Sequence, residues 1–306
     1  MAWLLVRRLI CRTSLGCALE ISNKEMGVGK VKKVRKVKKL LLMFILLSPA
    51  AQANDVWYGI NDSGITVGQR FYCQYGIDWM PCGVVNNGGV VTTVPNGSWY
   101  DVGIFDINNS GQMVGQVVAP YGYPQAASCT LNGCGSLQYI LKNNRQSTAW
   151  KINDAGYILA SRSNYSTVSR KTTTTDVLIY GGSYTTLPKV EPSGGYSVTK
   201  YFALNNNLDT GGVYYNPTQS IPALGFIRTA AGVVTLIQYP DAKTTEVRGL
   251  SDDGTAVGVA CMALSRDFNI AGATCSDWVG FTYKDGEFTA VSGMPFDVNN
   301  YGGMAQ

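Results

Sequence analysis

Few residues in this chain could support acid–base or nucleophilic chemistry. The 306 residues include no histidine, which excludes Ser-His-Asp triads, Cys-His dyads and HExxH zinc sites. Carboxylates remain, and a glycosidase needs two of them, about 5 to 10 Å apart across a bound sugar. The acidic residues in long irregular stretches are Asp78, Asp106, Glu191, Asp241, Glu246 and Asp267. No two of them have the spacing of a recognisable catalytic pair, so we predict no catalytic residue, and a carboxylate-based glycoside hydrolase or lyase stays as the alternative.

Six cysteines follow residue 53 and fall into three local couples, at separations of 9, 5 and 14 residues. They are Cys73 and Cys82, Cys129 and Cys134, and Cys261 and Cys275. Six cysteines allow fifteen pairings, but in a chain of stacked repeats only local partners are easily brought within disulfide distance. We therefore predict three local disulfides. A zinc site is disfavoured because the chain has no C-x-x-C motif and no histidine.

The N-terminal segment has the pattern of an export signal. A cationic run over 30–39 precedes an apolar stretch over 40–47, and the small-residue site Ala51-Gln52-Ala53 follows. Eight apolar residues are too few to cross a bilayer, which needs about 20. We predict a leader and signal peptide over 1–53, with Met26 as a possible true start, and a repeat domain over 54–306 without a membrane span.

Charge is distributed unevenly between these two parts. The leader carries 11 Lys/Arg against 2 Asp/Glu, and the remainder carries 14 against 18. A mildly acidic repeat domain offers no electrostatic reason to bind nucleic acid. Export and paired cysteines together predict a secreted, periplasmic or cell-surface location.

One nine-residue motif recurs six times after the leader, with starts 47, 45, 52, 46 and 48 residues apart. The copies begin at Ile60, Ile107, Ile152, Leu204, Leu250 and Val298. Each copy begins with an aliphatic residue, has Asn or Ser at the second position and has Asn or Asp at the third. Five of the six copies have Gly at the fifth position. This order is typical of a tight hairpin turn in which Gly adopts φ > 0. Leu208 replaces that Gly in the fourth copy, so we expect an altered turn there.

The Asn/Asp turns could also be interpreted as calcium sites. Most copies offer at most one carboxylate, whereas calcium takes about six to eight oxygen ligands. The hairpin interpretation is therefore favoured, and we predict neither a metal site nor a cofactor.

A second hairpin signal lies between successive copies, at 89–92, 135–138, 182–185, 232–235 and 286–289. Six motif hairpins and five intervening hairpins amount to 22 short strands, and no segment has helical periodicity. Four strands in about 47 residues are typical of a propeller blade. We predict an all-β propeller of five to six four-stranded blades, in which the strand near Val56–Ile60 lies beside that near Phe296–Val298. An open β-solenoid or a tandem β-sandwich is the alternative.

The motif Ile-Asn-[Asn/Asp]-x-Gly-x-x-Val-Gly, followed by an aromatic-bearing strand such as 225–227 or 280–283, resembles the HAF-repeat family of predicted extracellular repeat proteins. The resemblance covers most of the chain after the leader. Leu224-Gly225-Phe226 and Val279-Gly280-Phe281 stand where the family has His-Ala-Phe. The resemblance implies an extracellular location and a propeller form, and it transfers no defined activity.

Tyrosines gather in segments that lie between the predicted strands. These segments are 121–123, 180–184, 196–201 and 214–215. Exposed tyrosines offer a flat apolar face with a polar group, which suits sugars and protein partners. We therefore predict a binding or structural module, and the Tyr-rich loops are its candidate contacts with carbohydrate or with another surface protein.

Overall fold

The computed structural model describes residues 9–13, 16–19, 55–75, 78–95, 101–118, 122–132, 138–141, 146–166, 170–190, 198–215, 223–264 and 275–306. The chain divides into two compact units, Met1–Gln52 and Ala53–Gln306. In the first unit, β1 (Leu9–Thr13) pairs with β2 (Gly16–Leu19) in an antiparallel hairpin. The cationic, apolar and small-residue segments of the predicted signal all lie outside the described residues. No helix in the described part of the chain is long and apolar enough to cross a membrane.

The second unit contains five antiparallel sheets of four strands each, and each sheet is built from strands that follow one another in the sequence. Blade one is β3 (Asp55–Ile60), β4 (Thr66–Tyr75), β5 (Asp78–Asn87) and β6 (Val90–Thr93). Blade two is β7 (Asp101–Ile107), β8 (Gln112–Val118), β9 (Pro124–Thr130) and β10 (Gln138–Tyr139). Blade three is β11 (Gln146–Ile152), β12 (Ile158–Ser166), β13 (Lys171–Tyr180) and β14 (Ser183–Thr186). Blade four is β15 (Val198–Leu204), β16 (Thr210–Tyr215), β17 (Leu224–Arg228) and β18 (Val234–Ile237), and blade five is β19 (Thr244–Leu250), β20 (Ala256–Leu264), β21 (Cys275–Lys284) and β22 (Glu287–Val291).

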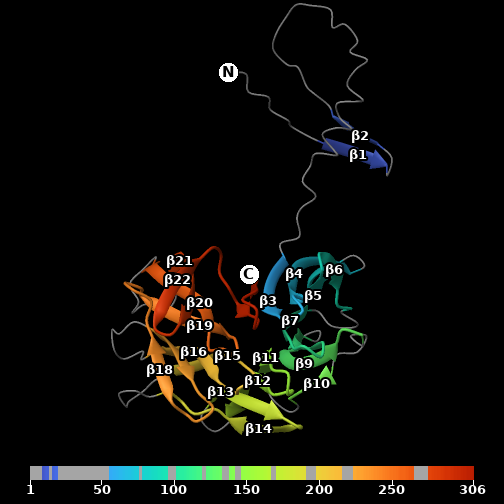
Figure 1. Ribbon diagram of the computed structural model, residues 1–306. Helices are drawn as coiled ribbons and strands as arrows, with labels where there is room; N and C mark the ends of the chain where they lie inside the picture. Colours follow the sequence, from blue (N-terminus) through green and yellow to red (C-terminus); the bar gives the residue numbers. More distant parts are fainter. Residues whose placement is uncertain are drawn as a thin grey trace, which may run out of the picture. The chain divides into compact units, whose positions relative to one another are not determined.

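These sheets are the blades of a β-propeller, and the described residues contain no helix (Figure 1). Each motif copy connects the first strand of its sheet to the second. The 22 predicted strands correspond to β3 through β24, so the predicted propeller is confirmed with five four-stranded blades. The surplus hairpin, β23 (Asp297–Val298) with β24 (Met304–Ala305), forms a two-stranded sheet of its own.

The hairpin β23–β24 lies at the seam between the first and last blades. The backbone N–H of Ile60 donates to Asp297 at 3.3 Å, and the rings of Tyr58 and Phe296 meet with centroids 5.1 Å apart. The predicted proximity of the two terminal segments is therefore confirmed. An open solenoid would have left them at opposite ends of the domain.

The motif turns have the predicted backbone. Gly64, Gly111, Gly156, Gly254 and Gly302 all have φ between 76° and 85°. The expectation for the fourth copy was wrong, because Leu208 adopts φ 64° and donates its N–H to the Asn205 carbonyl as the glycines do in their turns. The left-handed conformation costs a non-glycine residue about 1 to 2 kcal/mol. Leu208 offsets part of that cost by packing against the core cluster that blades three and four share.

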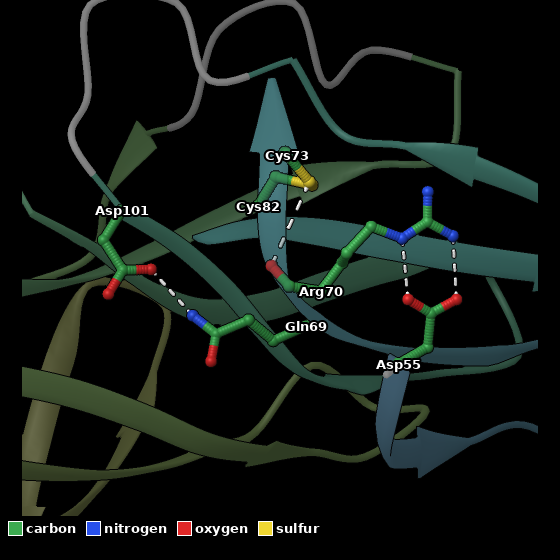
Figure 2. The surroundings of a disulfide bond; sticks show 6 residues. All are labelled: Asp55, Gln69, Arg70, Cys73, Cys82 and Asp101. Atoms are coloured by element: carbon green, nitrogen blue, oxygen red, sulfur yellow. Dashed lines mark hydrogen bonds and ion pairs between the residues drawn. A yellow bond between two sulfur atoms is a disulfide. The ribbon is translucent and has the colours of Figure 1, made fainter. Parts of the chain in front are cut away.

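Two of the three predicted disulfides are present, Cys73–Cys82 between β4 and β5 and Cys261–Cys275 between β20 and β21. Cys129 is also disulfide-bonded, and its predicted partner Cys134 lies outside the described residues. In Figure 2 the first disulfide lies beside Arg70, whose guanidinium makes two bonds to Asp55 at 2.7 and 2.8 Å.

Apolar side chains are buried between neighbouring blades. Val67 and Val85 of blade one, for example, share a cluster with Ile104, Met113 and Val117 of blade two. A single blade has two faces and cannot bury both by itself, so each depends on its neighbours. This packing holds the first strand of each blade close to a common axis.

Candidate functional site: an axial pocket lined by aromatic residues

In every four-stranded blade, the pairing of the first two strands skips one residue of the innermost strand. The skipped residues are Tyr58, Phe105, Trp150, Phe202 and Arg248. Each lies two positions before the aliphatic residue of its motif copy, and Phe296 has the same place before β23. A bulge re-aims side chains, and these six line a single cavity of about 320 Å³, which we call the axial pocket.

The aromatic side chains of the axial pocket form a nearly continuous wall. Phe105 stacks on Trp150 with centroids 5.3 Å apart, and Phe202 meets Trp150 edge-on at 6.3 Å. On the other side, Tyr58 contacts both Phe105 and Phe296 edge-to-face. Arg248 continues the wall beyond Phe296, with its guanidinium 4.8 Å from the centroid of that ring. Arrangements of this kind stabilise one another beyond simple burial, by about 0.5 to 1.5 kcal/mol per aromatic pair.

Hydrogen bonds fix the orientation of Trp150 within this wall. Its indole Nε1–H donates to the Ser161 hydroxyl at 2.8 Å, and that hydroxyl donates to Asp176. Burial raises the pKa of Asp176, while the bond from Ser161 opposes that rise. The indole therefore presents a preorganised face to the pocket.

Planar polar groups interrupt the aromatic wall. Arg248 donates to Glu246 at 3.0 Å, and both side chains are partly exposed. Gln69 donates to Asp101 at 2.7 Å, and Figure 2 shows it directed to the opposite side of β4 from its neighbour Arg70. Burial raises the pKa of Asp101, against the bond from Gln69. Burial, and then the charge of Asp101, raise the pKa of Tyr58, so its phenol keeps its proton at neutral pH.

A buried triad of charged residues lies on the axis next to the pocket. Asp106, Lys151 and Asp297 each follow a pocket residue by one position and come from β7, β11 and β23. Lys151 lines the axial pocket, and its ammonium lies 2.8 Å from Asp297. Burial raises the pKa of Asp106 well above its ordinary value, Lys151 opposes this, and contact with Asp297 raises it further. The Asp106 carboxyl also accepts the Ile152 N–H at 2.7 Å.

Glycine makes room for the buried triad in the two blades that flank β23. A Cβ at Gly59 would lie 2.5 Å from the Asp106 Cα, and one at Gly249 would lie 2.8 Å from the Asp297 Cα. Non-bonded carbon atoms do not approach each other this closely. A side chain at either glycine would therefore displace Asp106 or Asp297. Gly59 and Gly249 are thus required for Asp106 and Asp297 to take their places in the buried triad.

The opposite end of the axis carries what we call the turn ring, formed by the third residue of each motif copy. Around the ring these residues alternate between aspartate and asparagine: Asp62, Asn109, Asp154, Asn206, Asp252 and Asn300. Every asparagine amide donates to the aspartates on both sides, at 2.8 to 3.1 Å. Every backbone N–H of the six donates to the side-chain Oδ1 of the next residue, at 2.8 or 2.9 Å. The network is closed, and Asn300 joins the last copy to the first.

The turn ring leaves little capacity for a ligand. Burial alone would raise the pKa of Asp62, but bonds from the Asn300 backbone and from the amides of Asn109 and Asn300 hold it below its ordinary value. The cavity on this side measures about 60 Å³, room for a few water molecules. Among the described residues, no group of three or more Cys, Asp or Glu side chains is arranged to hold a metal ion.

The structure separates the acidic residues that were considered for catalysis. Asp106 is buried in the triad, Glu246 lines the axial pocket in its pair with Arg248, and Asp241 is exposed in a turn with φ 61°. The side chain of Asp78 and the whole of Glu191 and Asp267 lie outside the described residues. Of the described residues that line the axial pocket, Glu246 is the single carboxylate.

The Tyr-rich segments do not form one surface. Tyr201 and Tyr214 are core residues, 2 % and 5 % exposed, so they are unavailable to a partner and the expectation for them was wrong. Tyr180 and Tyr184 are exposed on the outer strands of blade three, and Tyr123 is exposed before β9. Tyr121 and Tyr196 lie outside the described residues.

The aromatic wall was not anticipated from the sequence, although a signal for it exists. Aligning the six motif copies and reading two positions upstream gives Tyr, Phe, Trp, Phe, Arg and Phe. The alternation of Asp and Asn in the turn ring is visible in the same alignment. Neither a scan against protein-family models nor a search of curated proteins finds a match to this chain.

Proposed function

We propose that this protein is a secreted or cell-surface binding module that holds a sugar in the axial pocket. The observation that carries the proposal is the convergence of five aromatic rings with Glu246, Arg248 and Gln69 around one cavity of about 320 Å³. Ligand pockets are typically concave and mostly apolar, with a few placed polar groups. A pyranose suits these walls because its C–H faces pack on aromatic rings and its hydroxyls pair with planar polar groups.

Electrostatics favour an uncharged ligand. Arg248 is paired with Glu246 and Lys151 with Asp297, and burial raises the pKa of Asp106 well above its ordinary value. A strongly charged ligand would have to break one of these pairs, at the cost of leaving a partly buried charge alone. A sugar without ionised groups can accept and donate hydrogen bonds while both pairs persist.

Binding is favoured over the alternative, a carboxylate-based glycoside hydrolase or lyase. Glycosidases place two carboxyl groups about 5 to 10 Å apart across the sugar. Glu246 is one such group, already engaged by Arg248, and Asp106 is buried beyond the pocket wall. An export leader and paired cysteines support the extracellular location, as does the resemblance to the HAF-repeat family.

The test is binding and turnover on one panel of soluble glucans, xylans and chitin oligosaccharides. Unmodified protein should bind a member of the panel without releasing products, and Trp150→Ala should lose that binding by tenfold or more. Tyr184→Ala is the matched control, because Tyr184 is an exposed aromatic on β14, remote from the axial pocket residues in the sheet order. Product release that Glu246→Gln abolishes would establish the enzyme instead. Binding equally weakened by Tyr184→Ala would move the site to the outer strands.

A further inference from the structure

A second cavity adjoins the axial pocket. It measures about 550 Å³ and lies between blades four and five, and we call it the radial groove. Its lining includes Phe202 and Glu246, which also line the axial pocket. Because the two cavities share these side chains, they lie directly next to each other.

The radial groove repeats the chemistry of the axial pocket. Aromatic surface comes from Phe202, Tyr215 and Trp278, the last with 37 % of its surface exposed. Polar groups come from Lys200 and Glu246. Glu246 is already paired with Arg248, and an uncharged chain can lie along the groove without breaking that pair.

The backbone around the groove is held in place. Ala223 and Thr244 form a parallel bridge between the two blades, in which the Thr245 N–H donates to the Ala223 carbonyl at 2.9 Å. Cys261 lies opposite Trp278 in the pairing of β20 with β21, and its disulfide to Cys275 ties the two strands together. A groove fixed by a bridge and a disulfide loses little conformational freedom when it binds.

We infer that the ligand is a linear, uncharged oligosaccharide whose terminal unit enters the axial pocket while the following units lie along the radial groove. This inference rests on the proposed function and specifies its ligand. The groove is the larger of the two cavities, so a ligand that fills both is longer than one sugar ring. Trp278 is the groove residue best suited to stack on an inner unit, because it is the most exposed of the groove's aromatic residues among those whose exposure is described.

The experiment is calorimetric titration with β-1,4-linked gluco-, xylo- and chito-oligosaccharides of one to six units, and with galacturonic acid oligomers as the charged comparison. For at least one neutral series, affinity should rise by on the order of tenfold or more between one and four units. Trp278→Ala should remove that rise and leave the single-unit affinity unchanged, whereas Trp150→Ala should weaken every length. Trp278→Phe, which keeps a ring, should retain part of the rise, and thermal melts show whether each variant is folded.

The outcomes separate this inference from the proposed function. An affinity that does not change with length overturns the extended ligand and leaves the axial pocket as the sugar site. Tighter binding of the galacturonic acid series overturns the uncharged class. The absence of binding to any series overturns the proposed function itself.

Discussion

The two ends of the propeller axis are built by the same six repeats and have opposite characters. At the turn ring, every asparagine amide donates hydrogen bonds to the aspartates of the two neighbouring copies. At the axial pocket, the equivalent position carries Phe in three copies and Tyr, Trp and Arg in the others, and a cavity of about 320 Å³ is left. Repetition at one end saturates the hydrogen bonds and closes the domain. Variation at the other end supplies the diverse surface that binding needs.

The buried triad divides the two ends, so removing its charge balance should have the largest effect on stability. The double variant Asp106→Asn/Asp297→Asn leaves the Lys151 ammonium without a carboxylate, which typically costs about 3 to 5 kcal/mol. Chemical denaturation of the double variant measures this loss. Asp106→Asn alone is the control, because Asp297 still pairs with Lys151 in that variant. If both variants are equally stable, the triad does not hold the axis together.

The turn ring should show the next largest effect at its closing residue. Asn300→Ala removes amide bonds to Asp62 and Asp252, and losing hydrogen bonds to charged groups costs about 1.5 to 3 kcal/mol. Asn206→Ala removes the equivalent amide bonds, to Asp154 and Asp252. These bonds join copies that follow one another in the sequence, and not the last copy to the first. Both should destabilise the domain, but hydrogen exchange should accelerate in β3 and β23 for Asn300→Ala alone. Equal exchange in the two variants would mean that the ring does not close the seam.

The buried triad and the turn ring should also make the stability of the domain depend on pH, in opposite directions. Because burial raises the pKa of Asp106, the folded chain holds a proton that the unfolded chain has released above about pH 4, and stability falls as pH rises towards the folded pKa. One such proton gives a slope of at most about 1.4 kcal/mol per pH unit. The lowered pKa of Asp62 acts in the other direction, and its contribution is lost as pH falls through the acidic range.

Denaturation of the unmodified protein and of Asp106→Asn between pH 4 and 8 separates the two contributions. The variant should show a shallower decline with rising pH, because Asp101 and Asp176, whose pKa values are also raised, still contribute, and it should keep the loss of stability in acid. A decline of the same steepness in both proteins would assign it to another group.

The smallest effect concerns the turn backbone. Gly156→Leu gives the third turn the residue that the fourth has, and should cost about 1 to 2 kcal/mol through the left-handed conformation. Leu208 shows that such a turn forms, so the ring should stay closed. The measurement is a thermal melt, with ligand affinity as the control. A loss of sugar binding would show that the two ends are coupled.

Much of the architecture could be predicted from the sequence, because short-range rules determine it. Six copies at nearly constant spacing determine the strand count, and glycine at the fifth position determines the turn. The turn at Leu208 escaped prediction since tertiary packing overrode a local preference. The surplus hairpin could be counted, but its place at the seam depends on contacts between residues 238 positions apart, such as Asn300 and Asp62.

The candidate site was largely missed because its residues are brought together by a bulge that local patterns do not reveal. Trp150 and Phe202 look like ordinary strand residues until the register shift turns them to the axis. Tyrosine-rich segments were the visible signal, yet Tyr201 and Tyr214 are in the core. Of the acidic residues considered, Glu246 lines the axial pocket and Asp106 lies in the buried triad. Their spacing along the chain does not predict either position.

The central claim is that ligand binds at the aromatic end of the axis and that the turn ring serves to close the domain. A structure determined with the tightest-binding oligosaccharide of the panel tests it most directly. The account predicts a sugar ring stacked on Trp150 inside the axial pocket, with further units leading past Phe202 towards Trp278. A ligand found against the turn ring, or against Tyr180 and Tyr184 on the outer strands, would contradict it.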